Sequence, residues 1–421
     1  MKKNIAIIGS GISGLTCGHL LSPHHNVKVF ESNHYIGGHT NTVSVNVEGK
    51  DYRVDTGFIV YNDWTYPNFI ALMDKIGVSG QDTEMSFSVK HQKTGLEYNG
   101  NSLNTLFAQR RNIVRPSFYS MLSDIVKFNN LCKKMHADNA IDESLTLDQL
   151  VHKHKLGTNF TQHYLYPMCA AIWSSSLEQV TSFSAKFFIN FFVNHGLLNI
   201  TDRPQWQTIK GGSSEYITPL TTNFSHDIHL NTAVNNVKRD GKQYKISLDD
   251  GHEWLADDVI FACHSDQALK LLDSPSDAQT EVLGALRYAK NDVVLHTDTS
   301  VLPTRPLAWA SWNYLLTGED SETSRPAALT YNMNILQRIE SDTTFCVTLN
   351  KTDNIDSSKI LRRFTYAHPQ FSKTSLAAQQ ERSRICGENN LHFCGAYWYN
   401  GFHEDGVRSA LDVCQRFGIY L

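Results

Sequence analysis

Six residues near the start of the chain have the glycine spacing of a phosphate-binding turn, Gly9-Ser10-Gly11-Ile12-Ser13-Gly14. In such a turn Gly9 allows the tight bend, Gly11 lets the backbone approach a pyrophosphate, and Gly14 lets a helix pack close to a strand. Phosphate charge then meets free N–H groups at the positive end of that helix. Glu31 follows 20 positions after Gly11 and is placed to accept hydrogen bonds from ribose hydroxyls. The spacing predicts a site for the ADP half of a dinucleotide.

The segments around this turn have the patterns of the elements that must position it. The apolar run Ile5–Ile8 predicts a buried strand before the turn, and a helix-like segment follows it. A second strand is predicted over Val27–Phe30, so that Glu31 stands at its end. This context favours a Rossmann-like unit over a glycine turn without a ligand.

A second glycine pair, Gly37-Gly38, favours FAD over NAD, because NAD-binding Rossmann units do not need it. Three segments share one pattern: Gly9-x-Gly11-x-x-Gly14-Leu15-x-x-Gly18, Val27-x-Val29-Phe30-Glu31 and Gly37-Gly38-His39-Thr40. Together they resemble the N-terminal fingerprint of the FAD-containing amine oxidase-like superfamily, which includes monoamine and polyamine oxidases, protoporphyrinogen oxidase and phytoene desaturase. His39 stands where amine oxidases have Arg, which suggests a bacterial branch that includes flavin desaturases of fatty-acyl chains.

The C-terminal segment resembles the same superfamily. A buried strand is predicted over 391–396, followed by an aromatic loop and a helix over 406–417. The resemblance implies that Gly395 passes near the ribityl and phosphate groups, and that the helix N-terminus points at the pyrimidine end of the flavin. Phe402 stands where amine oxidases have Tyr, which favours an apolar substrate over an amine. We expect Phe402 over the flavin ring, in contact with substrate, and His403 beside the ring.

The resemblance implies cofactor contacts that are spread along the chain. They are Gly9, Gly11, Ile12, Ser13, Gly14, Glu31, Ser32, Gly37, Gly38, His39, Thr40, Thr56, Gly57, Val234, Val237, Cys263, Gly395, Gly406 and Val407. No Cys or His is assigned as a covalent link, so the expected cofactor is noncovalent FAD. Glu404 and Asp405 are expected to complement the dipole of the last helix.

These contacts fall in three segments, 1–66, 205–272 and 391–421, so we expect a discontinuous FAD-binding domain. The segments between them, 67–204 and 273–390, would form the substrate-binding domain, the first largely helical and the second rich in strands. The predicted fold class is α/β, a Rossmann-like FAD-binding domain with an inserted α+β substrate domain.

Flavin chemistry needs only a hydride acceptor and a positioned substrate, so few catalytic side chains are expected. In amine oxidases a Lys near flavin N5 begins a strand, and Lys290 is the candidate here. Matching strand to strand instead places Asn291 or Asp292 at that position, and a slip of one residue turns a side chain to the opposite face. His296 could relay a proton, although a core histidine is the favoured interpretation.

Two further clusters each allow two interpretations. A helical stretch over 183–198 carries five phenylalanines, Phe183, Phe187, Phe188, Phe191 and Phe192. Such a face is typical of a core but would also suit the wall of a tunnel for a long apolar ligand. Arg110, Arg111 and Arg115 would suit an anionic head group or peripheral contact with a membrane, although a solvated basic turn is the commoner explanation.

Composition excludes several classes of function. A net charge of -4 and a pI near 6.5 give no basic field for nucleic acid. The eight cysteines form no CxxC pair and a strand begins at Asn4 instead of a signal sequence, so a cytoplasmic location is expected. The 19 histidines lack the spacing of zinc or iron sites, and no GxSxG elbow occurs. Neither a metal nor an acyl-transfer nucleophile is expected.

Three functions remain. The favoured one is an FAD-dependent oxidoreductase that removes a hydride from a largely apolar, fatty-acyl-like substrate, as a desaturase or dehydrogenase does. Amine oxidation follows from the superfamily but is weakened by His39 and Phe402. A flavin-dependent isomerase that moves a double bond without net redox would use the same site. The expected partner is a small-molecule or lipid-like substrate, and no oligomeric state is predicted.

Overall fold

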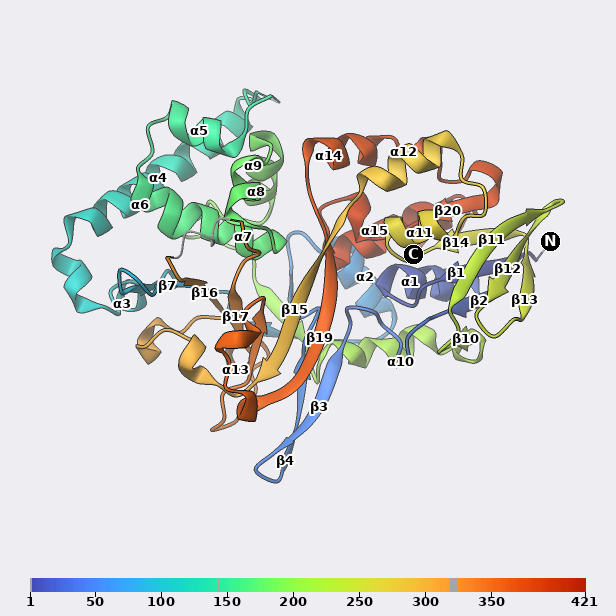
Figure 1. The fold of residues 1–421 in the computed structure, drawn as a ribbon, viewed down its shortest axis with the longest axis horizontal. Coiled ribbons are helices and arrows are strands. Elements are labelled where there is room, and N and C mark those ends of the chain that lie inside the picture. The colour runs from blue at the N-terminus through green and yellow to red at the C-terminus, as the bar shows by residue number, and fades with distance from the viewer. Residues whose placement is uncertain (1, 143, 319–323) are drawn as a thin grey trace.

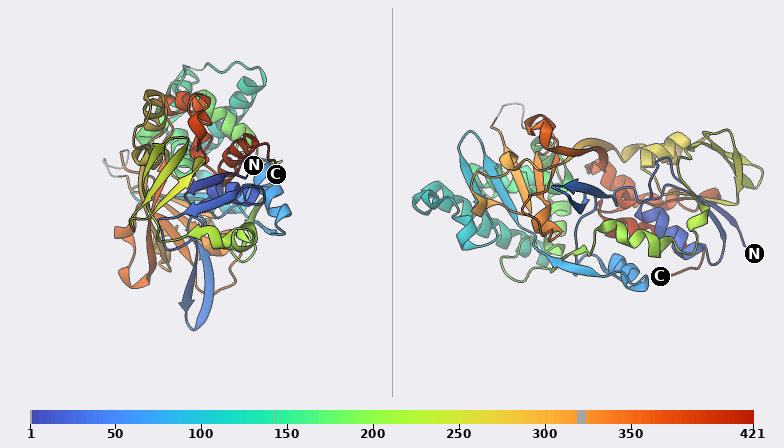
Figure 2. Two further views of the ribbon diagram at one scale, coloured as in Figure 1. Left: turned by 90° about the vertical axis from the view of Figure 1, so that its right-hand side faces the viewer. Right: turned by 90° about the horizontal axis from the view of Figure 1, so that it is seen from below.

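The computed structural model describes residues 2–142, 144–318 and 324–421. The other residues, which fall within the predicted domain segments, lie outside this description. Figures 1 and 2 show an elongated molecule with a strand-rich end that holds the N-terminus and a helical end opposite to it. None of the described helices is long and apolar enough to cross a bilayer.

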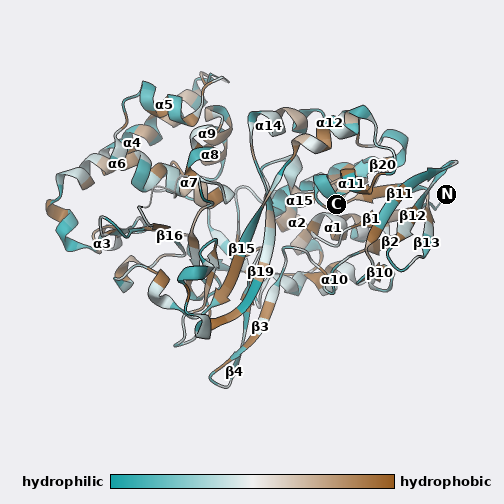
Figure 3. Cartoon of the chain, in the orientation of Figure 1, coloured by the Kyte–Doolittle hydropathy of each residue, from teal (hydrophilic) through white to brown (hydrophobic). Residues whose placement is uncertain are grey.

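A five-stranded parallel sheet forms the centre of the end that holds the N-terminus. Its strands, in the order β10-β2-β1-β14-β20, are Ile228–His229, Asn26–Phe30, Asn4–Ile8, Asp258–Phe261 and Leu391–Phe393. Strand β1 is hydrophobic and buried on both faces, as a central parallel strand must be (Figure 3). Helices α1 (Ile12–Leu21) and α15 (His403–Gln415) pack against each other beside the sheet. The Rossmann-like α/β prediction is confirmed.

Because all five strands are parallel, their carboxyl ends meet at one edge of the sheet. Strand β1 lies between β2 and β14. The chain therefore continues from β1 to β2 on one side and later adds β14 on the other side. Ligands of such sheets bind outside the carboxyl ends at this switch point. Gly9, Glu31 and Cys263, which follow β1, β2 and β14, are therefore brought to the same edge.

A second, seven-stranded sheet occupies the middle of the molecule. Its strands, in the order β19-β15-β18-β17-β16-β7-β8, are Ile360–Pro369, Tyr288–His296, Cys346–Leu349, Leu329–Asn332, Trp312–Leu316, Phe87–His91 and Leu96–Asn99. The long antiparallel pair β15–β19 runs between the two ends in Figure 1. Smaller sheets are the hairpin β3 (Thr42–Val47) and β4 (Lys50–Asp55), the meander β11 (Val234–Asp240), β12 (Gln243–Leu248) and β13 (Glu253–Ala256), and the set β5 (Tyr61–Asn62), β9 (Trp206–Ile209) and β6 (Gly80–Thr83).

Helices from the first inserted segment form the opposite end. They are α3 (Leu103–Leu106), α4 (Pro116–Ala137), α5 (Leu147–Lys153), α6 (Thr158–Phe160), α7 (Tyr166–Trp173), α8 (Leu177–Thr181) and α9 (Ala185–Asn194). The remaining helices are α2 (Pro67–Lys75), α10 (Ile217–Thr221), α11 (Ser265–Leu271), α12 (Asp277–Ala285), α13 (Met333–Leu336) and α14 (Lys373–Gln380). One hydrophobic core lies around the parallel sheet and a second among the helices of the opposite end. Phe402 packs against both cores.

Two predicted boundaries at the C-terminus were wrong. The last strand ends at Phe393 instead of residue 396, and the last helix begins at His403 instead of residue 406. The helix begins early because the carboxylate of Asp405 accepts a hydrogen bond from the backbone N–H of Phe402, which caps the first turn. Cys263 likewise lies beyond the end of β14.

Candidate active site

The three glycines of the first turn are glycine for different structural reasons. A Cβ on Gly9 would lie 2.9 Å from the carbonyl oxygen of Ala262, and one on Gly14 would lie 2.1 Å from that of Gly9. A Cβ on Gly11 would meet no atom within 4 Å. The fold thus requires Gly9 and Gly14, whereas Gly11 faces open space. No described side chain caps the N-terminus of α1, and its first turn holds no acid, so the positive end of the helix is available to a phosphate.

Residues that follow the turn join it to the last helix and to the second glycine pair. The Ser13 hydroxyl donates to the carbonyl of Gly406 at 2.9 Å, and a Cβ on Gly406 would lie 2.7 Å from Cγ2 of Ile12. Gly406 therefore lets α15 approach α1, and Val407 is fully buried behind it. Gly38, with a φ of 59°, lies against Gly11. The two glycine segments form one surface at the sheet edge.

Glu31 is held at this edge by protein donors. One carboxylate oxygen accepts from the backbone N–H and hydroxyl of Ser10, at 2.9 and 2.7 Å. The other accepts from the backbone N–H and side-chain amide of Asn33, at 2.9 and 3.0 Å. The neighbouring Ser32 is exposed. The backbone of Thr232 donates to the carbonyl of Glu31, which brings the start of β11 beside the acid.

The remaining predicted cofactor contacts differ in how deeply they are buried near this edge of the sheet. Val234 is partly buried at the start of β11, whereas Val237 lies in the core and its backbone pairs with Leu272. Burial raises the pKa of Cys263 to about 12, so it is a protonated thiol. The backbone N–H of Gly395 donates to the hydroxyl of Ser409 in α15 at 2.8 Å.

Thr40 and His403 connect the second glycine segment to the last helix. Their Oγ1 and Nε2 atoms lie 3.0 Å apart, and both contact the hydroxyl of Tyr216. The His403 ring stacks on Phe58, with 3.6 Å between ring centroids. Burial lowers the pKa of His403 to about 3, so the ring is neutral and fixed in place.

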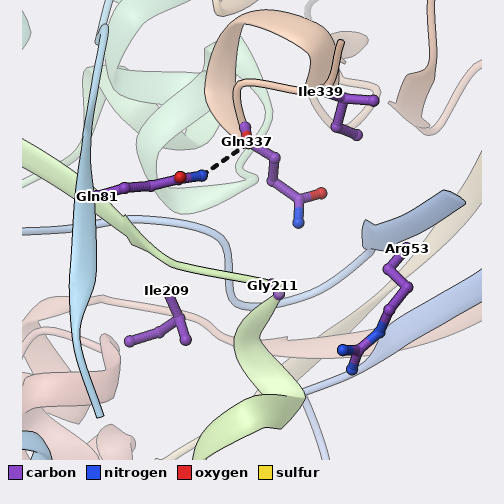
Figure 4. Close-up of a pocket in the computed structure, with 7 residues that line it drawn as sticks. Arg53, Gln81, Ile209, Gly211, Gln337 and Ile339 are labelled. Carbon is purple, nitrogen blue, oxygen red and sulfur yellow. Dashed lines mark hydrogen bonds between the residues drawn. The ribbon is translucent and has the colours of Figure 1, made fainter. Parts of the chain in front are cut away.

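Asp55, Thr56 and Gly57 fix the backbone that carries His39. A Cβ on Gly57 would lie 2.2 Å from the carbonyl oxygen of His39, and the Thr56 hydroxyl lies 3.0 Å from that of Tyr366. Burial raises the pKa of Asp55 to about 6, and Ser213 donates to its carboxylate. Figure 4 shows a pocket of mixed lining whose Gln337 also contacts Asp55. It is lined by Arg53, Gln81, Ile209, Gly211, Gly212, Gln337 and Ile339. No residue predicted for the site lines that pocket.

Three histidines gather beside the glycine surface. The His39 ring lies 5.5 Å from that of His368 and 6.4 Å from that of His264, between centroids, and 5.0 Å from Tyr366. Burial lowers the pKa of His39 well below its usual range and that of His368 to about 4. Nε2 of His39 is buried without a partner among the described residues. A buried nitrogen of this kind needs a hydrogen-bond partner, which a bound cofactor would supply.

A chain of polar side chains leads to His368. The amide of Asn350 donates to Oδ1 of Asn291 at 2.8 Å, and the amide of Asn291 donates to Nδ1 of His368 at 3.3 Å. The hydroxyl of Ser174 lies 3.0 Å from the same Nδ1. Because Nδ1 accepts and the ring is neutral, the proton of His368 is on Nε2, where it can be donated.

The structure does not bring Lys290 or His296 to the three histidines. Lys290 is exposed, whereas Asn291, the next residue of β15, is fully buried, so their side chains leave opposite faces of the strand. His296 is also fully buried: its Nε2 lies 2.7 Å from the hydroxyl of Thr348, and its Nδ1 accepts from the backbone of Asp298. Of the two neighbours on β15, Asn291 therefore points toward the histidines and Lys290 points away from them.

Phe402 lies where the aromatic face of α9 meets the N-terminus of α15. Its ring stacks on Phe191, with centroids 5.4 Å apart and an interplanar angle of 22°. Phe187, on the same helix, stacks on Phe371 at 5.4 Å. Phe183, Phe188, Phe191 and Phe192 are buried, and Phe187 is partly exposed. The aromatic face of α9 thus belongs mainly to the hydrophobic core, and Phe191 at its edge contacts Phe402.

Glu404 has a role that the sequence did not indicate. Its carboxylate accepts from the backbone N–H groups of Asn68 and Phe69, at 3.2 and 2.8 Å, and so caps the N-terminus of α2. Burial raises the pKa of Glu404, and raises that of Asp405 to about 7. Both acids serve helix N-termini, one of them on a neighbouring helix.

Sequence reasoning also missed Ser10, Asn33, Ser174, Asn350 and His368. The alternation of Phe364, Tyr366 and His368 on β19 was a usable signal, since residues two apart share a face of a strand. Ser174, with a φ of 49° at the end of α7, carried no signal that points to the site.

Known proteins resemble this chain in family and in fold. A family model described as flavin containing amine oxidoreductase matches residues 12–335, more than half of the chain. No curated protein matches the sequence. The chain is similar to the solved structure of a CLA-producing fatty acid isomerase from P. acnes, with 15% identity, a TM-score of 0.70, and 99% of this chain and 98% of that chain covered.

Two other solved structures are similar to the same extent. Wild-type putrescine oxidase bound to putrescine has 16% identity and a TM-score of 0.65, with 99% and 100% of the chains covered. A putative protoporphyrinogen oxidase from Exiguobacterium sp. 255-15 has 14% identity and a TM-score of 0.68, with 99% of both chains covered. At these identities the likeness shows a shared fold.

Proposed function

Because the chain belongs to the flavin containing amine oxidoreductase family and FAD is its cofactor, we propose that it removes a hydride from a largely apolar, fatty-acyl-like substrate. The observation that carries this proposal is the stack of Phe402 on Phe191. It places an apolar aromatic surface at the N-terminus of α15, and Phe402 lacks the hydroxyl that a tyrosine would add to an amine-binding aromatic cage. Among the similar structures, one acts on a fatty acid.

The residues of the glycine surface fit FAD, and we propose that they hold it noncovalently. Gly11 and the N-terminus of α1 would receive the pyrophosphate, Glu31 the ribose, and Nε2 of His39 a polar group of the cofactor. FAD bound there supplies the hydride acceptor. We propose the segments 1–66, 205–272 and 391–421 as its domain, with 67–204 and 273–390 as the substrate domain.

The chain's own residues would bind and orient the substrate. Phe402 and Phe191 would contact an acyl chain and exclude water from it. The Nε2–H of His368 would donate a hydrogen bond to a polar atom beside the flavin ring, because Nδ1 of the neutral imidazole accepts from Asn291. The substrate would lose a hydride to the flavin and a proton to solvent, and oxygen or another acceptor would then take up the two electrons and return the enzyme to its oxidised form.

Anaerobic mixing of the holoenzyme with two substrate panels tests the proposal. Saturated and unsaturated fatty-acyl compounds in micelles should bleach the oxidised flavin band and yield a product two hydrogens lighter. A product of unchanged mass would instead establish isomerisation. Bleaching by amines alone, with aldehyde and hydrogen peroxide formed in air, would contradict the proposed substrate class.

A further inference from the structure

Large apolar side chains are exposed together at the helical end of the molecule, around α3 and the start of α4 (Figure 1). Leu103 and Val114 are 77% and 82% exposed, and Ile113 and Tyr119 are 49% and 47% exposed. We call these four residues the apolar patch. Scattered exposed apolar residues are normal, but a contiguous group of them marks an interaction site.

The elements that carry the patch are joined by contacts of neighbouring residues. The guanidinium of Arg110, in the short helix η1 (Arg110–Val114), donates to the carbonyls of Asn104 and Phe107, which joins η1 to α3. The ring of Phe107 lies 6.1 Å from that of Tyr119, in the first turn of α4. A further turn, η6 (Pro306–Ala308), packs against α3.

Positive charge surrounds the patch. Arg110 and Arg111 precede Ile113 and Val114 in the sequence and Arg115 follows them, and the sequence holds no acid between Glu97 and Asp124. Glu97 is buried against Thr304 and Arg305, and Asp124 accepts from the backbone of Gly157. Across the described ranges, none of the three arginines forms an ion pair; their bonds go to carbonyl and amide oxygens.

We propose that this face docks on the surface of an anionic phospholipid bilayer. Leu103, Ile113 and Val114 would enter the boundary between head groups and acyl chains, while the arginines contact lipid phosphates. The charge complementarity favours this occupant over an apolar protein surface, which would leave three guanidinium groups desolvated and unpaired.

The docking proposal is separate from the proposed reaction. It does not depend on whether the substrate is a lipid. The core behind the patch contains Phe118 and is the same core against which Phe402 packs. If the substrate is an acyl lipid, the patch would hold this end of the enzyme at the place where such substrates are found; this last link rests on the proposed function.

Vesicle flotation of the FAD-loaded protein tests the docking. We expect it to float with vesicles that contain phosphatidylglycerol and not with pure phosphatidylcholine. The triple variant Arg110→Gln, Arg111→Gln, Arg115→Gln should lower partitioning roughly 100-fold, since each basic side chain near an anionic surface contributes about fivefold. Leu103→Glu with Val114→Glu should also abolish flotation. As a matched control, Leu255→Glu, at an exposed position on β13, should float as the wild type does.

Three outcomes would overturn the proposal. They are failure of the wild type to bind anionic vesicles, equal loss in the Leu255→Glu control, and a patch variant that changes the oligomeric mass in light scattering without changing flotation. The last result would assign the patch to a second copy of the chain. Flavin reduction by a soluble substrate is measured on the same preparations, so that a failed docking test and a failed substrate proposal are distinguished.

Discussion

The side-chain amide of Asn291 donates a hydrogen bond to Nδ1 of His368, with 3.3 Å between the two nitrogen atoms. The bond crosses the antiparallel pair β15–β19 and fixes which nitrogen of His368 carries the proton. Lys290, one residue earlier, leaves the opposite face of β15. The buried side of this strand therefore presents the amide of Asn291, and the amine of Lys290 lies on the other side.

This relationship predicts opposite results for two neighbouring substitutions. Asn291→Leu should slow anaerobic flavin reduction at least tenfold, because it removes the donor that orients His368. Lys290→Met should leave the rate within twofold, because its side chain is exposed away from the histidines. A strong loss in Lys290→Met, with Asn291→Leu near the wild-type rate, would restore Lys290 as the residue near flavin N5.

His368→Ala should lower the rate of flavin reduction roughly 100-fold while FAD occupancy is retained, because the donor on Nε2 is lost. Ser174→Ala, which removes only a partner of Nδ1, should have a smaller effect. Since the pKa of His368 is about 4, the wild-type rate should show no titration of this group above about pH 5. The measurement is the rate of flavin reduction per bound flavin at several pH values above about 5. A titration of this group in that range would contradict the prediction.

Phe402→Ala should raise the KM for an apolar substrate roughly 10- to 100-fold, which corresponds to about 1.5–3 kcal/mol of lost apolar contact. FAD content should stay intact, since the phosphate surface is untouched. Phe402→Tyr keeps the stack on Phe191 and serves as the conservative control. If Phe402 merely packs the two cores, stability and bound flavin will fall together while reduction per bound flavin stays at the wild-type rate.

Two glycines of the first turn should respond differently to substitution. Gly11→Val should abolish FAD binding yet change the free energy of unfolding of the apoprotein by less than about 0.5 kcal/mol, because that position faces open space. Gly14→Ala should destabilise the fold itself by at least about 1–3 kcal/mol, because its Cβ meets the Gly9 carbonyl. Flavin content and denaturant unfolding of both variants separate the two effects. Retention of FAD by Gly11→Val would remove the pyrophosphate from this turn.

Buried His296 should make the protein less stable in acid. Burial lowers its pKa from the ordinary 6.5 to about 4, so its contribution to stability is present above pH 6.5 and is lost as the pH falls toward 4. His296→Gln can still hydrogen-bond Thr348 but cannot titrate, so it should remove up to about 3 kcal/mol of the difference in stability between pH 7 and pH 4. The exposed His252→Gln is the control, and denaturant unfolding at several pH values is the measurement.

The Rossmann-like unit could be predicted because its signals are local. Strand, glycine turn, helix and Glu31 follow one another within a short stretch, and Gly9 and Gly14 answer backbone requirements of that stretch. The same holds for the last strand and helix, apart from their ends. The helix begins earlier because a side chain, Asp405, caps a turn that the hydrophobic pattern places outside the helix.

The polar chain around His368 could not be predicted, because it joins Ser174, Asn291 and Asn350 from three separate elements. Such contacts depend on strand register, and a one-residue shift separates Lys290 from Asn291. The capping of α2 by Glu404 is equally non-local. Sequence indicates that such an acid suits a helix N-terminus, but only the packing of α15 on α2 shows which helix it serves.

The order of the strands in the parallel sheet has a consequence for how the chain is made. Ile5 on β1 pairs with Asp258, and Val259 on β14 pairs with Leu391, so the first strand to leave the ribosome waits for most of the chain to follow. Such non-local pairing is slow to form, and an unpaired strand edge is prone to aggregate. The edge of the sheet to which Glu31 and Cys263 belong is therefore completed only after β20 has been made, so the chain can bind its cofactor there only late in its synthesis.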